Sequence, residues 1–172
     1  LQKSKFITRI IFMMLLFMSI NTTKAQSVKD SIELVKFIND FPNANALSSP
    51  GNFTVINNTV YFAASTGAEG RELWKSDGTE AGTEIVKDIF PGTGGSNIGF
   101  ILNVGGTMFF SAYDNINGQE LWKSDGTEAG TILVKDINPG SSDSYIQGLT
   151  NVNGTLYFNA DNGTNGNEIW TS

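Results

Sequence analysis

The feature that most constrains this chain is a run of twelve residues that occurs twice without a change. The run ELWKSDGTEAGT spans residues 72–83 and recurs over residues 120–131. A third, partial copy begins at Glu168 and reads EIWTS. The tryptophans of the three copies lie 48 residues apart, at Trp74, Trp122 and Trp170. A fixed period of this length predicts a tandem array of one supersecondary unit.

Each unit contains a two-residue turn between two apolar runs. In the first unit, Asn57-Asn58 separates residues 53–56 from residues 59–64, and the equivalent pairs are Gly105-Gly106 and Asn153-Gly154. All three pairs tolerate positive φ at successive positions, which a two-residue type I′ hairpin turn requires. Because the flanking residues are β-branched or aromatic, each pair predicts a β-hairpin.

Two further strands are expected in each unit. In the first unit we expect them at residues 72–75 and 83–89, joined by the turn Asp77-Gly78-Thr79. Units of about 40 to 50 residues with four strands are typical of β-propeller blades. We therefore predict an all-β fold of tandem four-stranded antiparallel β-meander repeats of 48 residues, forming a partial β-propeller.

The second strand supports face-to-face packing of these units. It carries Val60 and Phe62 on one face and Tyr61 on the other. A strand that is apolar on both faces belongs in a sheet that is covered on both sides. The pattern therefore argues against a sandwich in which each sheet has one wet face.

The first 25 residues predict a secretory signal peptide. Three basic residues precede the apolar run 10–20, and Ala25 supplies a small residue at the expected cleavage point. A transmembrane helix needs roughly 18 or more apolar residues, and this run is shorter. We predict a signal peptide over 1–25, an N-terminal segment over 26–50, and repeats over 51–172, divided into 51–98, 99–146 and an incomplete 147–172.

The N-terminal segment contains a stray copy of the fourth-strand sequence. Residues 34–38 read LVKFI, which is similar to IVKDI at 85–89 and LVKDI at 133–137. We therefore expect a fourth-type strand at 34–38. Propellers often close their ring when one end of the chain supplies the missing strand of the last blade, but three blades are fewer than the usual four to eight. We expect the natural protein to continue beyond residue 172, or its blade edges to stay open.

The repeated run, followed by VKDI and PG, resembles the ELWxxDGT repeat family of secreted bacterial proteins. The resemblance covers roughly residues 33–172. It implies export, propeller-type tandem repeats and often a C-terminal sorting module for type IX secretion, which is not visible in this sequence. It implies no catalytic residues, because the family carries no agreed enzymatic activity. In the third copy Ile169 replaces leucine and the turn is missing.

Composition excludes several kinds of chemistry. The chain has no His and no Cys, so Ser-His triads, cysteine nucleophiles and the usual zinc sites are excluded. Without residues 1–25 the chain has 7 basic and 17 acidic side chains, a net charge of −10. This charge disfavours nucleic acid and anionic membrane surfaces as partners.

The residues that could carry chemistry recur in every complete unit. A catalytic carboxylate pair is one asymmetric constellation, so repeated acids are expected to be structural. These repeated acids are Glu72, Glu120, Asp88 and Asp136.

The turn and tryptophan residues also have structural interpretations. We expect Asx-turns rather than calcium ligands at the two repeated turns, since one Asp falls far short of six to eight oxygens. These turns consist of Asp77, Gly78 and Thr79, and of Asp125, Gly126 and Thr127. We expect Trp74, Trp122 and Trp170 to pack between blades rather than to stack on sugars.

The sequence therefore predicts a non-catalytic secreted or cell-surface repeat protein that acts as a binding, adhesion or display scaffold. No cofactor is expected, and the ligand is an unidentified protein or glycan. Loops that escape the repeat are the expected contact points, at residues 113–115, 143–145 and 161–162. The alternatives are part of an exported, carbohydrate-active propeller enzyme and a calcium-stabilised adhesion module.

Overall fold

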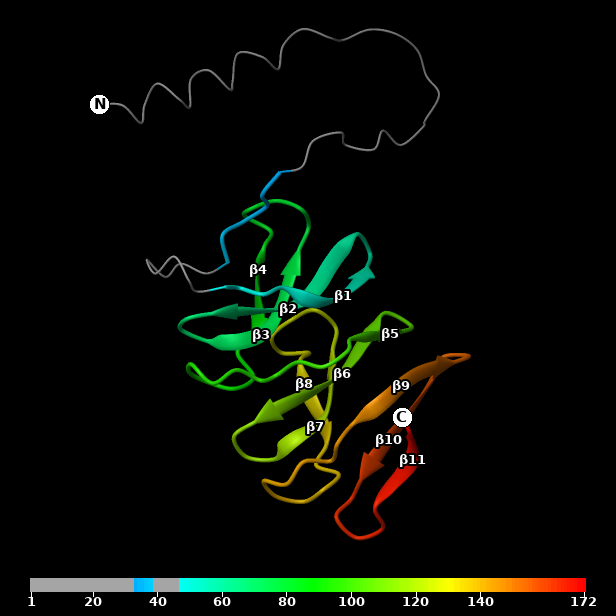
Figure 1. Cartoon of the computed structure of the whole chain (residues 1–172). Helices are drawn as coiled ribbons and strands as arrows, with labels where there is room; N and C mark the ends of the chain where they lie inside the picture. Colours follow the sequence, from blue (N-terminus) through cyan, green and yellow to red (C-terminus); the bar gives the residue numbers. More distant parts are fainter. Residues whose placement is uncertain (1–32, 39–46) are drawn as a thin grey trace, which may run out of the picture. The chain divides into compact units, whose positions relative to one another are not determined.

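The computed structural model describes residues 33–38 and 47–172, and these residues form three antiparallel sheets without helices (Figure 1). The first sheet consists of β1 (Gly51–Ile56), β2 (Thr59–Thr66), β3 (Gly70–Ser76) and β4 (Glu84–Lys87). The second consists of β5 (Leu102–Val104), β6 (Thr107–Asp114), β7 (Gly118–Ser124) and β8 (Ile132–Lys135). The third consists of β9 (Gln147–Val152), β10 (Thr155–Asp161) and β11 (Asn167–Thr171). The predicted all-β class and the antiparallel meanders are confirmed.

The hairpin turns have the predicted backbone conformation. Asn57 and Asn58 have φ of 48° and 63°, and Gly105 and Gly106 have φ of 60° and 92°. In the third sheet the turn pair has φ of 53° and 87°. Positive φ at both central residues matches the right-handed twist of the flanking strands. Three different residue pairs therefore form the same kind of turn.

The sheets bury apolar faces against one another. Tyr61 and Leu73 of the first sheet share a buried cluster with Phe110 and Trp122 of the second. On its opposite face the second sheet contributes Leu121 to a cluster with residues of the third sheet. Among the first strands of the three sheets, β5 adjoins both β1 and β9.

The fourth strands are shorter than predicted. β4 covers Glu84–Lys87 rather than residues 83–89. The backbone N–H of Ile89 donates to the carboxylate of Glu72 instead of to a neighbouring strand, so the chain leaves the ladder before this residue.

The strand predicted at residues 34–38 does not form. The described residues provide no ladder partner for this segment, and it lies against the first sheet, with Ile38 packed on the cluster of Phe62, Ala64 and Trp74. The predicted signal peptide over 1–25 lies outside the described residues. Within the described residues, no helix is long and apolar enough to cross a membrane.

Candidate functional site

The repeated turn between the third and fourth strands is held by its own side chains. In the first sheet Asp77 Oδ1 accepts the backbone N–H of Thr79 at 2.9 Å and its hydroxyl at 2.7 Å, which is Asx-turn geometry. Ser76 Oγ accepts the N–H of Gly78 at 3.0 Å and lies 2.7 Å from the hydroxyl of Thr83. The hydrogen bonds from Thr79 lower the pKa of Asp77.

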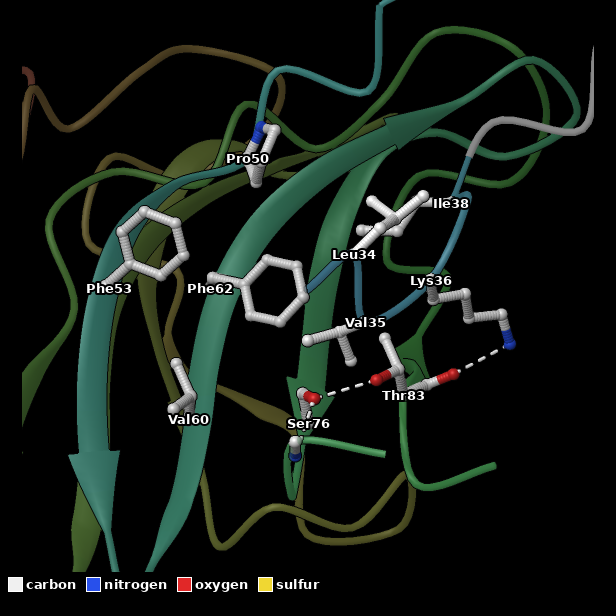
Figure 2. A pocket seen from close by; sticks show the side chains of 11 residues that line it. Leu34, Val35, Lys36, Ile38, Pro50, Phe53, Val60, Phe62, Ser76 and Thr83 are labelled. Atoms are coloured by element: carbon white, nitrogen blue, oxygen red, sulfur yellow. Dashed lines mark hydrogen bonds between the residues drawn. The ribbon is translucent and has the colours of Figure 1, made fainter. Parts of the chain in front are cut away.

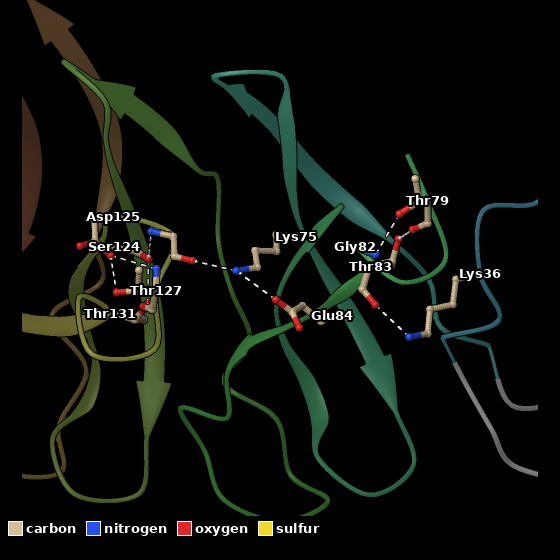
Figure 3. Close-up of polar contacts among 11 residues, drawn as sticks. Lys36, Lys75, Thr79, Gly82, Thr83, Glu84, Ser124, Asp125, Thr127 and Thr131 are labelled. Atoms are coloured by element: carbon tan, nitrogen blue, oxygen red, sulfur yellow. Dashed lines mark hydrogen bonds and ion pairs between the residues drawn. The ribbon is translucent and has the colours of Figure 1, made fainter. Parts of the chain in front are cut away.

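The second sheet repeats this network (Figure 3). Asp125 Oδ1 accepts from the N–H and the hydroxyl of Thr127 at 2.9 and 2.7 Å. The hydroxyls of Ser124 and Thr131 lie 2.8 Å apart. The same hydrogen bonds hold both copies of the turn, and the described residues contain no cluster of His, Cys, Asp or Glu that could hold a metal ion.

A buried glutamate clasps the segment that leads from the first sheet to the second. Glu72 on β3 has no exposed surface. Its carboxylate accepts the backbone N–H groups of Ile89 at 3.0 Å, Phe90 at 3.3 Å and Ser96 at 2.8 Å. The hydroxyl of Ser96 donates to the same carboxylate at 2.6 Å. Burial raises the pKa of Glu72 to about 7, and the hydrogen bonds from Ser96 and the backbone oppose that rise.

The equivalent glutamate of the second sheet makes the same kind of clasp. Glu120 is fully buried and accepts the N–H groups of Ile137 at 3.1 Å and Asn138 at 3.4 Å. The hydroxyl of Ser144 also donates to it, and burial raises the pKa of Glu120. A carboxylate enclosed by backbone donors is out of reach of a dissolved substrate. Glu168, at the equivalent position on β11, is exposed.

The other repeated acid is only partly paired. Asp88 and Asp136 each have one buried carboxylate oxygen without a partner in the described structure. The second oxygen of Asp136 accepts the N–H of Gly140 at 3.1 Å, in the turn that follows β8. Burial raises the pKa of Asp88. The two carboxylates lie at the same position of different sheets and form no catalytic pair.

The three tryptophans lie on equivalent third strands but differ in exposure. Trp74 and Trp122 are both 7% exposed and pack in apolar clusters. Trp170 is half-buried, and its indole N–H donates to the carbonyl of Ala160 at 3.0 Å. The ammonium of Lys135 lies 5.4 Å from the centre of the Trp170 ring, a cation–π contact between the second and third sheets.

An apolar pocket of about 320 Å³ lies between residues 34–38 and the first sheet (Figure 2). Val35, Phe53 and Phe62 contribute to its walls, and Pro50 closes one side. Its few polar neighbours include the hydroxyls of the first repeated turn, which already bond to one another. The pocket therefore offers apolar surface but no free acid or base.

The unrepeated loops, predicted as contact points, use most of their polar groups internally. Asp114 is buried and accepts the N–H of Ile116 at 2.9 Å. Asp143 accepts the N–H of Gln119 at 2.8 Å, and Asn162 accepts two N–H groups of its own loop. These side chains shape the loops rather than face solvent as free ligands.

Two exposed aromatic residues remain as candidate contact points. Tyr145 is 58% exposed and Phe100 is 63% exposed, and they lie in the segments that lead into β9 and β5. Tyr145 belongs to a loop that the sequence singles out, whereas sequence reasoning missed Phe100. The available signal was that the equivalent positions carry Asn52 and Gly148, so the aromatic side chain is not part of the repeat.

Comparison with protein-family models, with curated proteins and with solved structures gave no match for this chain.

Proposed function

We propose that this protein is a secreted or cell-surface scaffold of the ELWxxDGT type, non-catalytic, in which propeller blades present variable surface residues to a protein or glycan ligand. The observation that carries the proposal is the environment of Glu72 and Glu120. Both are fully buried, and both bond to the backbone of the segment that starts the next sheet. Acids enclosed in this way hold the repeat together and are not available for acid–base catalysis.

The neighbour relations of the strands support the propeller arrangement. β5 lies beside both β1 and β9, as expected when first strands gather around a common axis. The second sheet is covered on one face by the first sheet and on the other by the third. In a propeller every blade is covered in this way by its two neighbours.

Exposed aromatic residues outside the repeat support the binding role. A packing residue would recur in each unit and be buried, whereas Phe100 and Tyr145 do neither. Aromatic side chains give large contact area at low entropic cost and are common at binding surfaces.

The proposal is tested by screening the full chain on a glycan array and on insoluble polysaccharides, with release of reducing ends measured in parallel. We expect retention without release, and loss of retention in Phe100→Ala or Tyr145→Ala. Ile116→Ala is the matched control, since Ile116 is 70% exposed and lies in a different loop. Catalytic release of sugar would contradict the non-catalytic role, and loss of retention after chelation would favour a calcium-dependent module.

A further inference from the structure

The described sheets leave two faces that no other sheet covers. On the outer face of the third sheet Ile169 is 74% exposed and Tyr157 is 38% exposed. Their equivalents in the first sheet are Leu73 and Tyr61, which are 0% and 9% exposed because the second sheet covers them. The outer face of the third sheet therefore has the side chains of an inter-sheet surface without its neighbour.

The third sheet also has an open edge. Its strand order is β11-β10-β9, so β11 lacks the fourth strand that β4 and β8 provide in the other sheets. An edge strand presents unpaired N–H and C=O groups that can pair with another segment. Both the edge and the outer face are thus complementary to one further strand followed by one further sheet.

Residues 34–38 lie where such a fourth strand would lie. Ile38 packs on the face of the first sheet that carries Phe62 and Trp74. Ile89, which follows β4, packs in the same way with Phe110 and Trp122 of the second sheet.

The lysines of the two segments also correspond. Lys36 donates to the carbonyl of Thr83 at 2.9 Å (Figure 3), and Lys87 donates to the carbonyl of Glu128 at 3.5 Å. Each acceptor lies in the loop that precedes the fourth strand of the sheet on which the lysine segment lies. The segment 34–38 therefore has the position of the outer strand of a preceding sheet whose other strands are missing from the described structure.

Ser48 has the backbone geometry of the clasp serines. Its carbonyl accepts the N–H of Ser65 at 2.7 Å, just as the carbonyl of Ser96 accepts from Tyr113 at 2.6 Å. The residue after each serine has positive φ, 40° at Ser49 and 50° at the equivalent position. The Ser96 hydroxyl bonds to the glutamate of the preceding sheet, but Ser48 has no such glutamate in the described residues.

Glu168 is the missing counterpart. It occupies the position of Glu72 and Glu120 on its sheet, is exposed, and accepts no hydrogen bond within the described residues. One end of the array thus holds a serine without its glutamate, and the other end holds a glutamate without its serine.

We propose that two copies of this chain associate head to tail, with residues 34–38 of each copy pairing with β11 of the other and Ser48 donating to Glu168 across the interface. The proposal rests on the propeller arrangement proposed above. Each copy brings three sheets, so two copies reach the four to eight blades that closed rings contain. The same contact made twice about a two-fold axis closes the ring.

Cysteine cross-linking tests the pairing, because the chain has no Cys of its own. In the first sheet Leu73 pairs with Lys87, and the equivalent pair across the interface is Ile169 with Lys36. Paired strands place Cα atoms within the range that a disulfide spans. We expect the double variant Lys36→Cys/Ile169→Cys to form a covalent dimer on oxidation, while either single variant stays monomeric on a non-reducing gel. Monomer alone or an intramolecular disulfide overturns the proposal, and a ladder of larger species overturns the closed two-copy ring.

Sedimentation equilibrium of the full chain provides the second arm. We expect the mass of two chains, and Ile169→Asp should weaken the dimer by about 10-fold or more, because the charge enters the buried interface. Ile116→Asp is the matched control, since Ile116 is exposed to a similar extent and lies away from both ends of the array. A monomeric wild type overturns self-association and leaves the glycan-retention result intact, whereas a dimer that releases sugar refutes only the scaffold role.

Discussion

Replacing Glu72 by alanine removes the acceptor that holds the segment between the first two sheets. Ser96 keeps a partner, because its N–H and hydroxyl also donate to the carbonyl of Arg71 at 2.9 and 3.2 Å. The N–H groups of Ile89 and Phe90 have no such second acceptor and are left without a protein partner. A buried donor without a partner costs about 1–3 kcal/mol. Since Phe90 is only partly buried, we expect a loss of about 3 kcal/mol in the free energy of unfolding.

Urea unfolding at pH 8 measures this loss as a lower midpoint at unchanged slope. Glu120→Ala should cost a similar amount, since its clasp has the same geometry. Glu168→Ala is the control, because this glutamate has the same place in the repeat but is exposed, and it should change stability by less than about 0.5 kcal/mol in the monomer. Equal effects at Glu72 and Glu168 would refute the clasp.

Three further predictions concern the repeated turns and the buried acid. Gly78 and Gly126 both have φ of +90°, but only at Gly126 would an added Cβ meet the hydroxyl of Tyr61, so Gly126→Ala should destabilise the protein by about 1 kcal/mol or more beyond Gly78→Ala; equal losses in a thermal melt would contradict this packing. Thr131→Val removes a buried hydroxyl that bonds to its own turn and should cost about 1–2 kcal/mol in urea, whereas an unchanged midpoint would show that the turn needs no such bond. Because the pKa of Glu72 is about 7 in the fold against 4.5 ordinarily, the native state keeps a proton that the unfolded chain releases, so stability from this group is greatest below pH 4.5 and falls up to about pH 7; Glu72→Gln should remove that slope from a series of urea midpoints, and an unaltered slope would assign it to other groups.

Local signals in the sequence predicted much of the fold. The turn pairs Asn57-Asn58 and Gly105-Gly106 report their backbone conformation directly, because few residues tolerate positive φ. The 48-residue spacing of the tryptophans likewise places three third strands at equivalent positions. Both signals depend only on neighbouring residues or on exact repetition.

The clasp could not be predicted in the same way. Ser96 lies 24 residues beyond Glu72, and nothing in the sequence between them pairs the two. Recurrence of the glutamate indicated a structural role but not its partner. Residues 34–38 were predicted as a strand from their similarity to residues 85–89, yet a strand also needs a ladder partner, and the described residues provide none.

Spin-label distances test the central claim, that the sheets radiate from an axis on which their first strands meet. The chain has no Cys, so labels can be placed on first strands at Val55 and Asn103, and in a second sample on fourth strands at Glu84 and Ile132. Each pair occupies equivalent positions in the first two sheets. Packed sheets lie about 10 Å apart, and we predict that the fourth-strand pair is clearly farther apart than the first-strand pair. Equal distances for the two pairs would mean that the sheets stack in parallel, and the propeller arrangement would be wrong.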